Sequence, residues 1–165
     1  MTQSIEDQLE ILSRKLGHIL RERGLTLGVA ESCTGGLLGH TLTNVPGSSD
    51  YFKGGIVAYA NPIKHRLLQV QESTLDQHGA VSQETALAMA RGVRSVLAVD
   101  VAAAITGVAG PGGGTPEKPV GTVWIAVSHA GGETSKLFHL PGDRMQVKRA
   151  SAQAAIEMLL HALEG

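Results

Sequence analysis

Apolar residues recur along this chain with two different periods, and their alternation predicts an α/β fold. At residues 5–20 they return every three or four positions, with Ser4 placed to cap a helix and Gly24 just beyond its end. Helical spacing returns after Ser82 and again from about Asp143. Between these segments, short apolar stretches bounded by turn residues are typical of strands.

The predicted strands lie at residues 25–30, 55–60, 99–106, 120–128 and 133–140. The last two flank Ala-Gly-Gly at 130–132, a hairpin spacing that predicts one antiparallel pair. Asn61 and Pro62 follow the second strand, where Asn is a good N-cap and Pro a good first helical residue. We expect one domain over residues 1–165, a three-layer α/β/α sandwich with a mixed, mostly parallel sheet of about five strands.

Charge and composition then narrow the classes of partner. The formal net charge is −1 and aromatic residues make up only 3%, which argues against nucleic acid and against an anionic membrane surface. The first ten residues are acidic where a signal peptide is basic, and no apolar run approaches the roughly 18 residues of a spanning helix. We expect a cytoplasmic protein that binds a small molecule. The sequence leaves the oligomeric state open, and a homo-oligomer is compatible with it.

Metal and thiol chemistry have little support in the sequence. Seven histidines are scattered without an HExxH or His-x-His motif, so we expect no metal. The single cysteine, Cys33, excludes an internal disulfide and is either a buried small residue or a nucleophile.

The segment AESCTGG, residues 30–36, carries the first candidate chemistry. A strand that ends here and turns through two glycines into a helix would leave the Ser32 hydroxyl beside helix N–H groups that lack partners. That arrangement suits acyl transfer. The alternative is an ordinary turn in which Ser32 or Thr34 only caps the helix.

Two further loops follow predicted strands and can meet the first one. In open α/β sheets, ligands bind outside the carboxyl ends of the strands. Tyr59 stands where the second strand ends, and Lys64 stands in the first helical turn, where the helix dipole disfavours a cation. If this lysine is also buried, its pKa falls and its neutral amine becomes a general base for a nearby hydroxyl. A solvated lysine beside an edge tyrosine is the alternative.

Glycines and one arginine supply candidate groups for binding an anion. The loop at residues 106–119 carries Gly107, Gly110 and Gly112, but it is neither a P-loop nor a dinucleotide fingerprint. Arg144 lies at the start of the last helix, where it either binds an anion or stays solvated.

Four motifs in this order, AESCTGG, YANPIK, TGVAGPGGG followed by KPVGTVW, and PGDR, resemble the CinA C-terminal domain family. The resemblance runs from about residue 5 to residue 163. It implies hydrolysis of the carboxamide of nicotinamide mononucleotide to nicotinate mononucleotide and ammonia, with no cofactor. The family's serine, tyrosine and lysine correspond here to Ser32, Tyr59 and Lys64. Full-length members carry a further N-terminal domain for which 165 residues leave no room, so the chain resembles the stand-alone deamidase form.

Amide hydrolysis assigns a role to each candidate group. Ser32 is the expected nucleophile, Lys64 its base and Tyr59 a proton relay or orienting group. We expect the N–H groups around Cys33 and Thr34 to stabilise the oxyanion. The remaining expected substrate-binding residues are Gly35, Thr106, Gly107, Gly110, Gly112 and Arg144. A non-catalytic nucleotide-binding or regulatory module, and an amidase that depends on Cys33, remain as alternatives.

Overall fold

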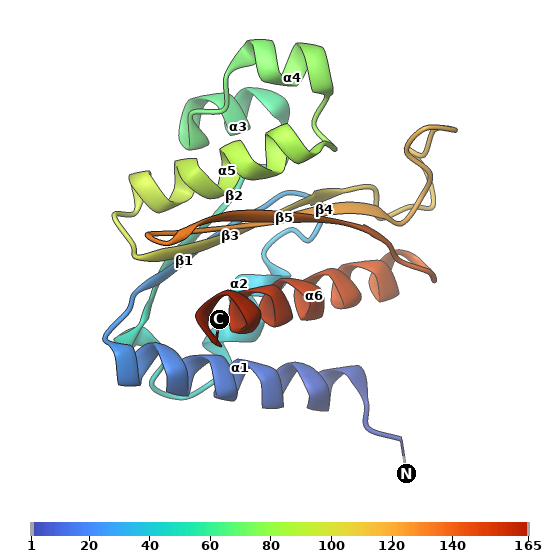
Figure 1. The fold of residues 1–165 in the computed structure, drawn as a ribbon. Coiled ribbons are helices and arrows are strands. Elements are labelled where there is room, and N and C mark those ends of the chain that lie inside the picture. Colours follow the sequence, from blue (N-terminus) through green and yellow to red (C-terminus); the bar gives the residue numbers. More distant parts are fainter. Residues whose placement is uncertain (1, 165) are drawn as a thin grey trace.

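The computed structural model describes residues 2–164 as a five-stranded sheet covered by helices on both faces (Figure 1). The elements in chain order are α1 (Ile5–Arg23), β1 (Leu27–Glu31), α2 (Leu37–Thr43), a 3-10 turn (Ser48–Asp50), β2 (Phe52–Val57), α3 (Asn61–Leu68), α4 (Glu72–His78), α5 (Gln83–Val96), β3 (Val101–Gly107), β4 (Thr122–His129), β5 (Gly132–His139) and α6 (Arg144–Glu164).

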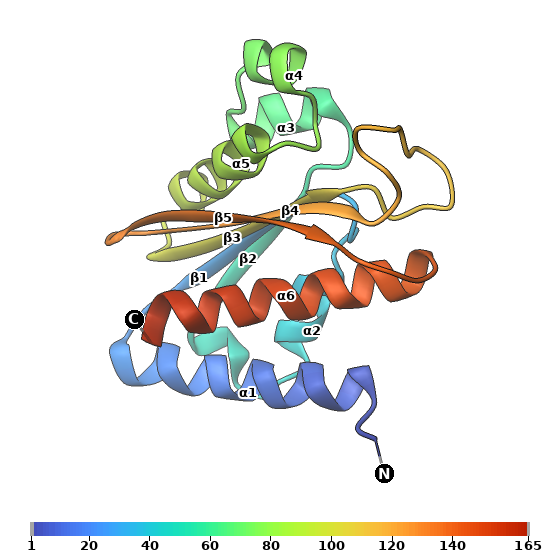
Figure 2. The ribbon, with the colours of Figure 1, turned by 45° about the vertical axis from the view of Figure 1, so that its right-hand side comes forward.

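The strand order is β2-β1-β3-β4-β5. β1 pairs in parallel with both β2 and β3, while β4 is antiparallel to β3 and to β5. All strands except β4 therefore point the same way, which confirms the mixed, mostly parallel sheet. Helices α1, α2 and α6 cover one face, and α3, α4 and α5 cover the other, as Figures 1 and 2 show.

Side-chain alternation along β3 divides the interior into two cores. Val101, Ala103 and Ile105 face the core beneath α1 and α6, whereas Ala102 and Ala104 face the core beneath α5. Small side chains on the second face let α5 lie close to the sheet, because no bulky group separates its backbone from β3.

Three helix termini lie where the sequence signals predict them. Ser4 accepts a hydrogen bond from the N–H of Asp7, and Ser82 accepts one from the N–H of Thr85, so both cap their helices as expected. Gly24 ends α1 in the left-handed conformation, with φ of 62°.

The prediction for the start of α3 was wrong by one position. Ala60 is the N-cap, and Asn61 and Pro62 are the first two helical residues. The reason lies in the sheet, because β2 stops at Val57 opposite Glu31, the last residue of β1. The predicted second strand, residues 55–60, is therefore shifted toward the C-terminus relative to β2, which covers Phe52–Val57. Residues 58–60 form a connection.

Helices α3 and α5 touch through their backbones. A Cβ on Gly92 of α5 would overlap the carbonyl oxygen of Leu68, the last residue of α3. This glycine therefore sets the distance between the two helices, and α3 is the helix that carries Lys64.

Candidate active site

The loops that follow β1, β2 and β3 meet in one cleft of about 270 Å³ at the carboxyl end of these strands. β1 lies between β2 and β3, so the three strand ends are adjacent, as the sequence led us to expect. Figure 2 shows the long loop between β3 and β4 at the same end of the sheet as the start of α6. Nine of the expected site residues line the cleft: Ser32, Cys33, Tyr59, Lys64, Thr106, Gly107, Gly110, Gly112 and Arg144.

Ser32 is the first residue after β1, and the backbone holds it firmly. Its N–H donates to the carbonyl of Ile105 at 3.0 Å, and its own carbonyl accepts from the N–H of Gly35 at 3.0 Å. Gly35 and Gly36 follow with φ of 61° and 105°, values that favour glycine. The glycine pair thus closes the turn of residues 32–35, which we call the serine turn, and leads into α2.

Lys64 reaches the serine from the first turn of α3. Its amine donates to Ser32 Oγ at 3.0 Å and to the carbonyl of Tyr59 at 2.9 Å. The side chain is 1% exposed, and this burial lowers the pKa of the amine, with the nearby Cys33 acting weakly the other way. The structure thus pairs a buried lysine with a hydroxyl, the arrangement that nucleophilic catalysis by serine needs.

Cys33 lies beside the serine but in a setting that keeps its thiol protonated. The residue is 6% exposed, and burial raises its pKa to about 11. None of the histidines is among the described residues that line the cleft, so no imidazole is placed to activate the sulfur.

Tyr59 and Arg144 meet at the mouth of the cleft. The tyrosine is 60% exposed, and its hydroxyl accepts a hydrogen bond from Arg144 at 3.1 Å. Arg144 also donates to the carbonyl of Gly110 at 2.7 Å. The guanidinium therefore joins the glycine-rich loop to the segment before α3. Tyr59 contributes its carbonyl to Lys64, while its hydroxyl is directed to the arginine.

Thr106 and Thr34 serve the architecture around the cleft. The hydroxyl of Thr106 donates to the carbonyl of Ala80 at 2.8 Å and so fixes the segment before α5 against β3. Thr34 and Gly35 do not line the cleft. Thr34 is 1% exposed, and its hydroxyl donates to the carboxylate of Glu31 at 2.6 Å.

Glu31 is the functional residue that sequence reasoning missed. Its carboxylate is buried and also accepts from the N–H groups of Leu38 and Gly39, at 2.9 and 3.0 Å. One side chain therefore ties the serine turn to α2. The available signal was a charged residue that directly follows a buried apolar strand and precedes a helix.

The N–H groups of Cys33 and Thr34, which the sequence singled out for an oxyanion, are not used by other residues, although the N–H of Cys33 contacts its own sulfur. Across residues 2–164, neither donates a hydrogen bond to another residue. Glu31 accepts from N–H groups further along the chain and does not occupy these two.

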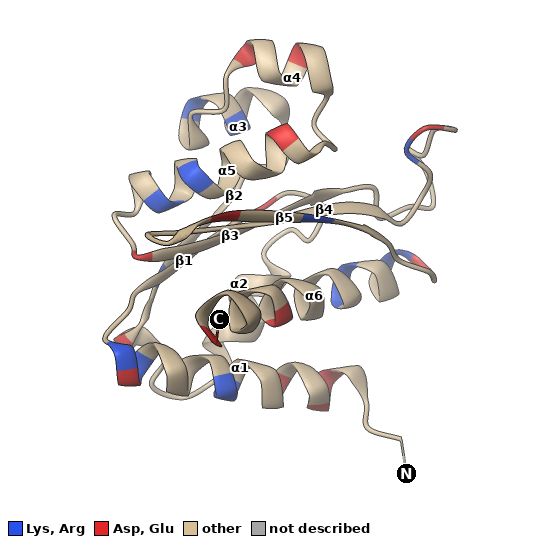
Figure 3. Cartoon of the chain, viewed as in Figure 1, with Lys and Arg blue, Asp and Glu red and all other residues tan. Residues whose placement is uncertain are grey.

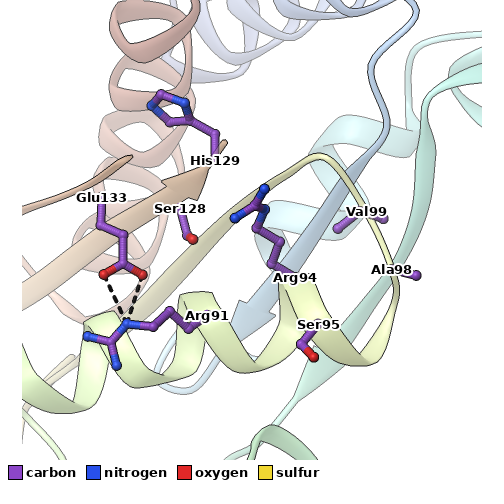
Figure 4. Close-up of a pocket in the computed structure, with 8 residues that line it drawn as sticks. All are labelled: Arg91, Arg94, Ser95, Ala98, Val99, Ser128, His129 and Glu133. Atoms are coloured by element: carbon purple, nitrogen blue, oxygen red, sulfur yellow. Dashed lines mark hydrogen bonds and ion pairs between the residues drawn. The ribbon is translucent and has the colours of Figure 1, made fainter. Parts of the chain in front are cut away.

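A second cleft, of about 510 Å³, lies at the opposite end of β3 and β4 (Figure 4). In it, Arg91 pairs with Glu133 at 2.8 Å, and Ser128 and His129 lie nearby. The ion pair neutralises the charge of Arg91. Among the residues that line this cleft, no hydrogen bond joins a nucleophile to a base. The arrangement does not resemble a site for acyl transfer.

In residues 2–164, no group of three or more His, Cys, Asp or Glu side chains is placed to hold a metal ion. No described helix is long and apolar enough to cross a membrane. Figure 3 shows Lys and Arg as well as Asp and Glu on helices on both sides of the sheet.

Known proteins match most of this chain in sequence. A CinA-like protein of Desulfotalea psychrophila is 48% identical over 150 residues, which are 91% of this chain and 36% of that protein. A CinA-like protein of Salinibacter ruber is 49% identical over 146 residues, 88% of this chain and 35% of that protein. The chain thus spans about a third of the length of these relatives.

Solved structures match along nearly the whole chain. The competence/damage inducible protein of Agrobacterium tumefaciens has a TM-score of 0.92 and 39% identity, with 96% of each chain covered. A CinA superfamily protein of Escherichia coli has a TM-score of 0.92 and 33% identity, covering 98% of this chain and 94% of its own. The family model for the CinA C-terminal domain matches residues 9–163. This chain therefore belongs to the CinA C-terminal domain family.

Proposed function

We propose that this chain hydrolyses the carboxamide of nicotinamide mononucleotide to nicotinate mononucleotide and ammonia. The observation that carries the proposal is the 3.0 Å contact between Ser32 Oγ and the buried amine of Lys64, whose pKa is lowered. A neutral amine at this distance accepts the hydroxyl proton as the oxygen attacks. The substrate itself comes from the resemblance to the family.

Acylation follows from the positions of the two side chains. Ser32 Oγ attacks the carboxamide carbon, and its proton passes to Lys64. The N–H of Cys33, the member of the expected pair that lines the cleft, stabilises the oxyanion, which is the group whose charge grows most in the transition state. Lys64 then returns the proton to the departing nitrogen, ammonia leaves and an ester to Ser32 remains.

Deacylation repeats the same proton transfers with water. Lys64 removes a proton from the water that attacks the ester carbon, and then protonates Ser32 Oγ as the carboxylate product leaves. The carbonyl of Tyr59, 2.9 Å from the amine, keeps Lys64 directed toward the serine through both half-reactions. Tyr59 therefore acts first through its backbone, and its hydroxyl orients Arg144.

The charges at the cleft favour an anionic substrate. Among the described residues that line it, none is a carboxylate, and Arg144 stays positively charged when the amine of Lys64 is neutral. Arg144 is a fork of hydrogen-bond donors suited to phosphate. The glycines at 110 and 112 let the backbone of the loop approach a ligand closely.

The test is release of ammonia by the purified protein from nicotinamide mononucleotide, with free nicotinamide and the dinucleotide as comparison substrates. We expect turnover of the mononucleotide and very slow turnover of nicotinamide, because remote groups of a substrate contribute to its positioning. Binding of the mononucleotide without ammonia release would contradict the proposal and favour a regulatory module. Equal rates on nicotinamide and the mononucleotide would contradict recognition of the ribose phosphate.

A further inference from the structure

Lys148, on α6, brings a second positive charge to the serine turn. The side chain is half-buried, and a Cβ built on Gly35 would lie 3.7 Å from its amine nitrogen. Its charge also favours the thiolate of Cys33, although burial of the thiol outweighs that influence. The lysine therefore lies beside Gly35 and Cys33, at the edge of the cleft and not among the residues that line it.

This ammonium has no partner within the protein. Across the described part of the chain, Lys148 makes neither an ion pair nor a side-chain hydrogen bond, whereas the next residue, Arg149, pairs with Glu6 at 3.1 Å. The carboxylate nearest in sequence to the serine turn, Glu31, is already occupied by Thr34 and two backbone N–H groups. A partly exposed ammonium without a partner in the protein is available to bind an anionic ligand.

Arg144 lies one helical turn before Lys148 on α6. Residues four apart on a helix share a face, with Cβ atoms about 5–6 Å from each other. Arg144 uses one N–H for Gly110 and one for Tyr59, so the remaining donors of its guanidinium are free to bind a ligand. Asp143, the adjacent carboxylate, accepts a hydrogen bond from the backbone of Gln146 and caps α6.

We propose that Lys148 and Arg144 together form the subsite for the phosphate monoester of the substrate, an inference that rests on the proposed deamidation. A phosphate monoester carries a charge of about −1.5 to −2 at neutral pH, which one cation leaves half neutralised and two cations match. Arg144 supplies the directional donors, and Lys148 supplies a mobile ammonium that follows the phosphate. The phosphate then lies along α6, while the carboxamide points to Ser32.

The experiment compares Lys148→Met with a matched control, Arg149→Met. Both changes remove one positive charge from neighbouring positions on α6, but Arg149 pairs with Glu6 on α1, whereas Lys148 lies beside the serine turn. Each variant is assayed with nicotinamide mononucleotide and with nicotinamide riboside, which differ only in the phosphate. We expect Lys148→Met to raise KM for the mononucleotide by about 10- to 100-fold, the loss of one charge-assisted contact, and to leave the riboside unaffected. Arg149→Met should change neither substrate, and Lys148→Arg should restore most of the affinity.

Two outcomes would overturn the subsite. If Lys148→Met leaves KM for the mononucleotide unchanged, the lysine does not bind the phosphate. If it lowers kcat equally on the mononucleotide and the riboside, the lysine acts at the reacting carbonyl.

Product binding separates this proposal from the proposed reaction. Nicotinate mononucleotide should raise the Tm of the wild type more than nicotinate riboside does, and Lys148→Met should reduce that difference, with Arg144 still present. This result would support the subsite even if the wild type released no ammonia. Ammonia release by the wild type together with an unchanged Lys148→Met would refute the subsite and leave the deamidation proposal standing.

Discussion

Replacing Ser32 with alanine gives the sharpest test of the mechanism, because the structure predicts a large loss of activity and only a small loss of stability. The change removes Oγ and with it the 3.0 Å contact to Lys64, but the amine keeps its hydrogen bond to the carbonyl of Tyr59. Both backbone contacts that hold the serine, to Ile105 and Gly35, are also kept. The fold therefore loses one hydrogen bond.

The size of each effect follows from these contacts. One hydrogen bond contributes about 1 kcal/mol, which lowers Tm by about 2–4 °C in a chain of this size. Loss of the nucleophile should lower kcat by about 10⁴- to 10⁶-fold, since no neighbouring group replaces the attacking oxygen. The measurements are ammonia release from nicotinamide mononucleotide and thermal unfolding of the same preparations.

Cys33→Ala is the matched control, since it removes one heavy atom from the adjacent residue of the same turn. The thiol has a pKa of about 11 and is not ionised at neutral pH, so kcat should stay within about tenfold of the wild type. An active Ser32→Ala variant together with an inactive Cys33→Ala variant would refute the serine mechanism and assign the thiol as nucleophile.

Three further predictions follow from the same site. Because burial lowers the pKa of Lys64 and its neutral amine is the reactive form, log kcat/KM should rise with pH at a slope near one below that pKa and level off above it. Lys64→Met should remove this rise and be nearly as inactive as Ser32→Ala. A flat pH profile of the wild type would contradict the role of Lys64 as the base. Glu31→Gln places an amide donor among N–H and hydroxyl donors, so it should lower the free energy of unfolding by about 1–3 kcal/mol and reduce kcat more than it changes KM. Denaturant unfolding and steady-state kinetics measure these two effects. An unchanged kcat would show that the carboxylate does not order the serine turn. Dialysis against a strong chelator should leave ammonia release intact, and loss of activity that zinc restores would indicate metal-assisted hydrolysis.

Local signals in the sequence predicted most of the framework. Ser4 and Ser82 cap helices because a hydroxyl directly before an amphipathic segment satisfies N–H groups whatever the tertiary context. The hairpin around residues 130–132 likewise follows from spacing alone. Helix α4 was not anticipated, because it contains no buried residue and therefore has no apolar stripe.

The sequence predicted which residues form the candidate site, but it did not predict the hydrogen bonds between them. The motifs placed Ser32 and Tyr59 at strand ends and Lys64 in the helical turn that follows, and the order of the strands then brought them together. The contacts of Arg144 with Gly110 and Tyr59 join residues far apart in sequence, so no local pattern encodes them. Glu31 was overlooked because its role depends on the path of the chain through the following turn.

The contact between Gly92 and the carbonyl of Leu68 links a position outside the cleft to the placement of Lys64, the proposed base. Leu68 ends the short helix that begins at Asn61, so displacing that end displaces the whole helix and, with it, the amine of Lys64. Even a methyl group at position 92 would act as a wedge between α3 and α5. A genetic screen for inactive variants should therefore recover substitutions on α5 that contact neither the substrate nor the catalytic side chains. Substitutions on that helix could also be used to adjust the distance between Lys64 and Ser32.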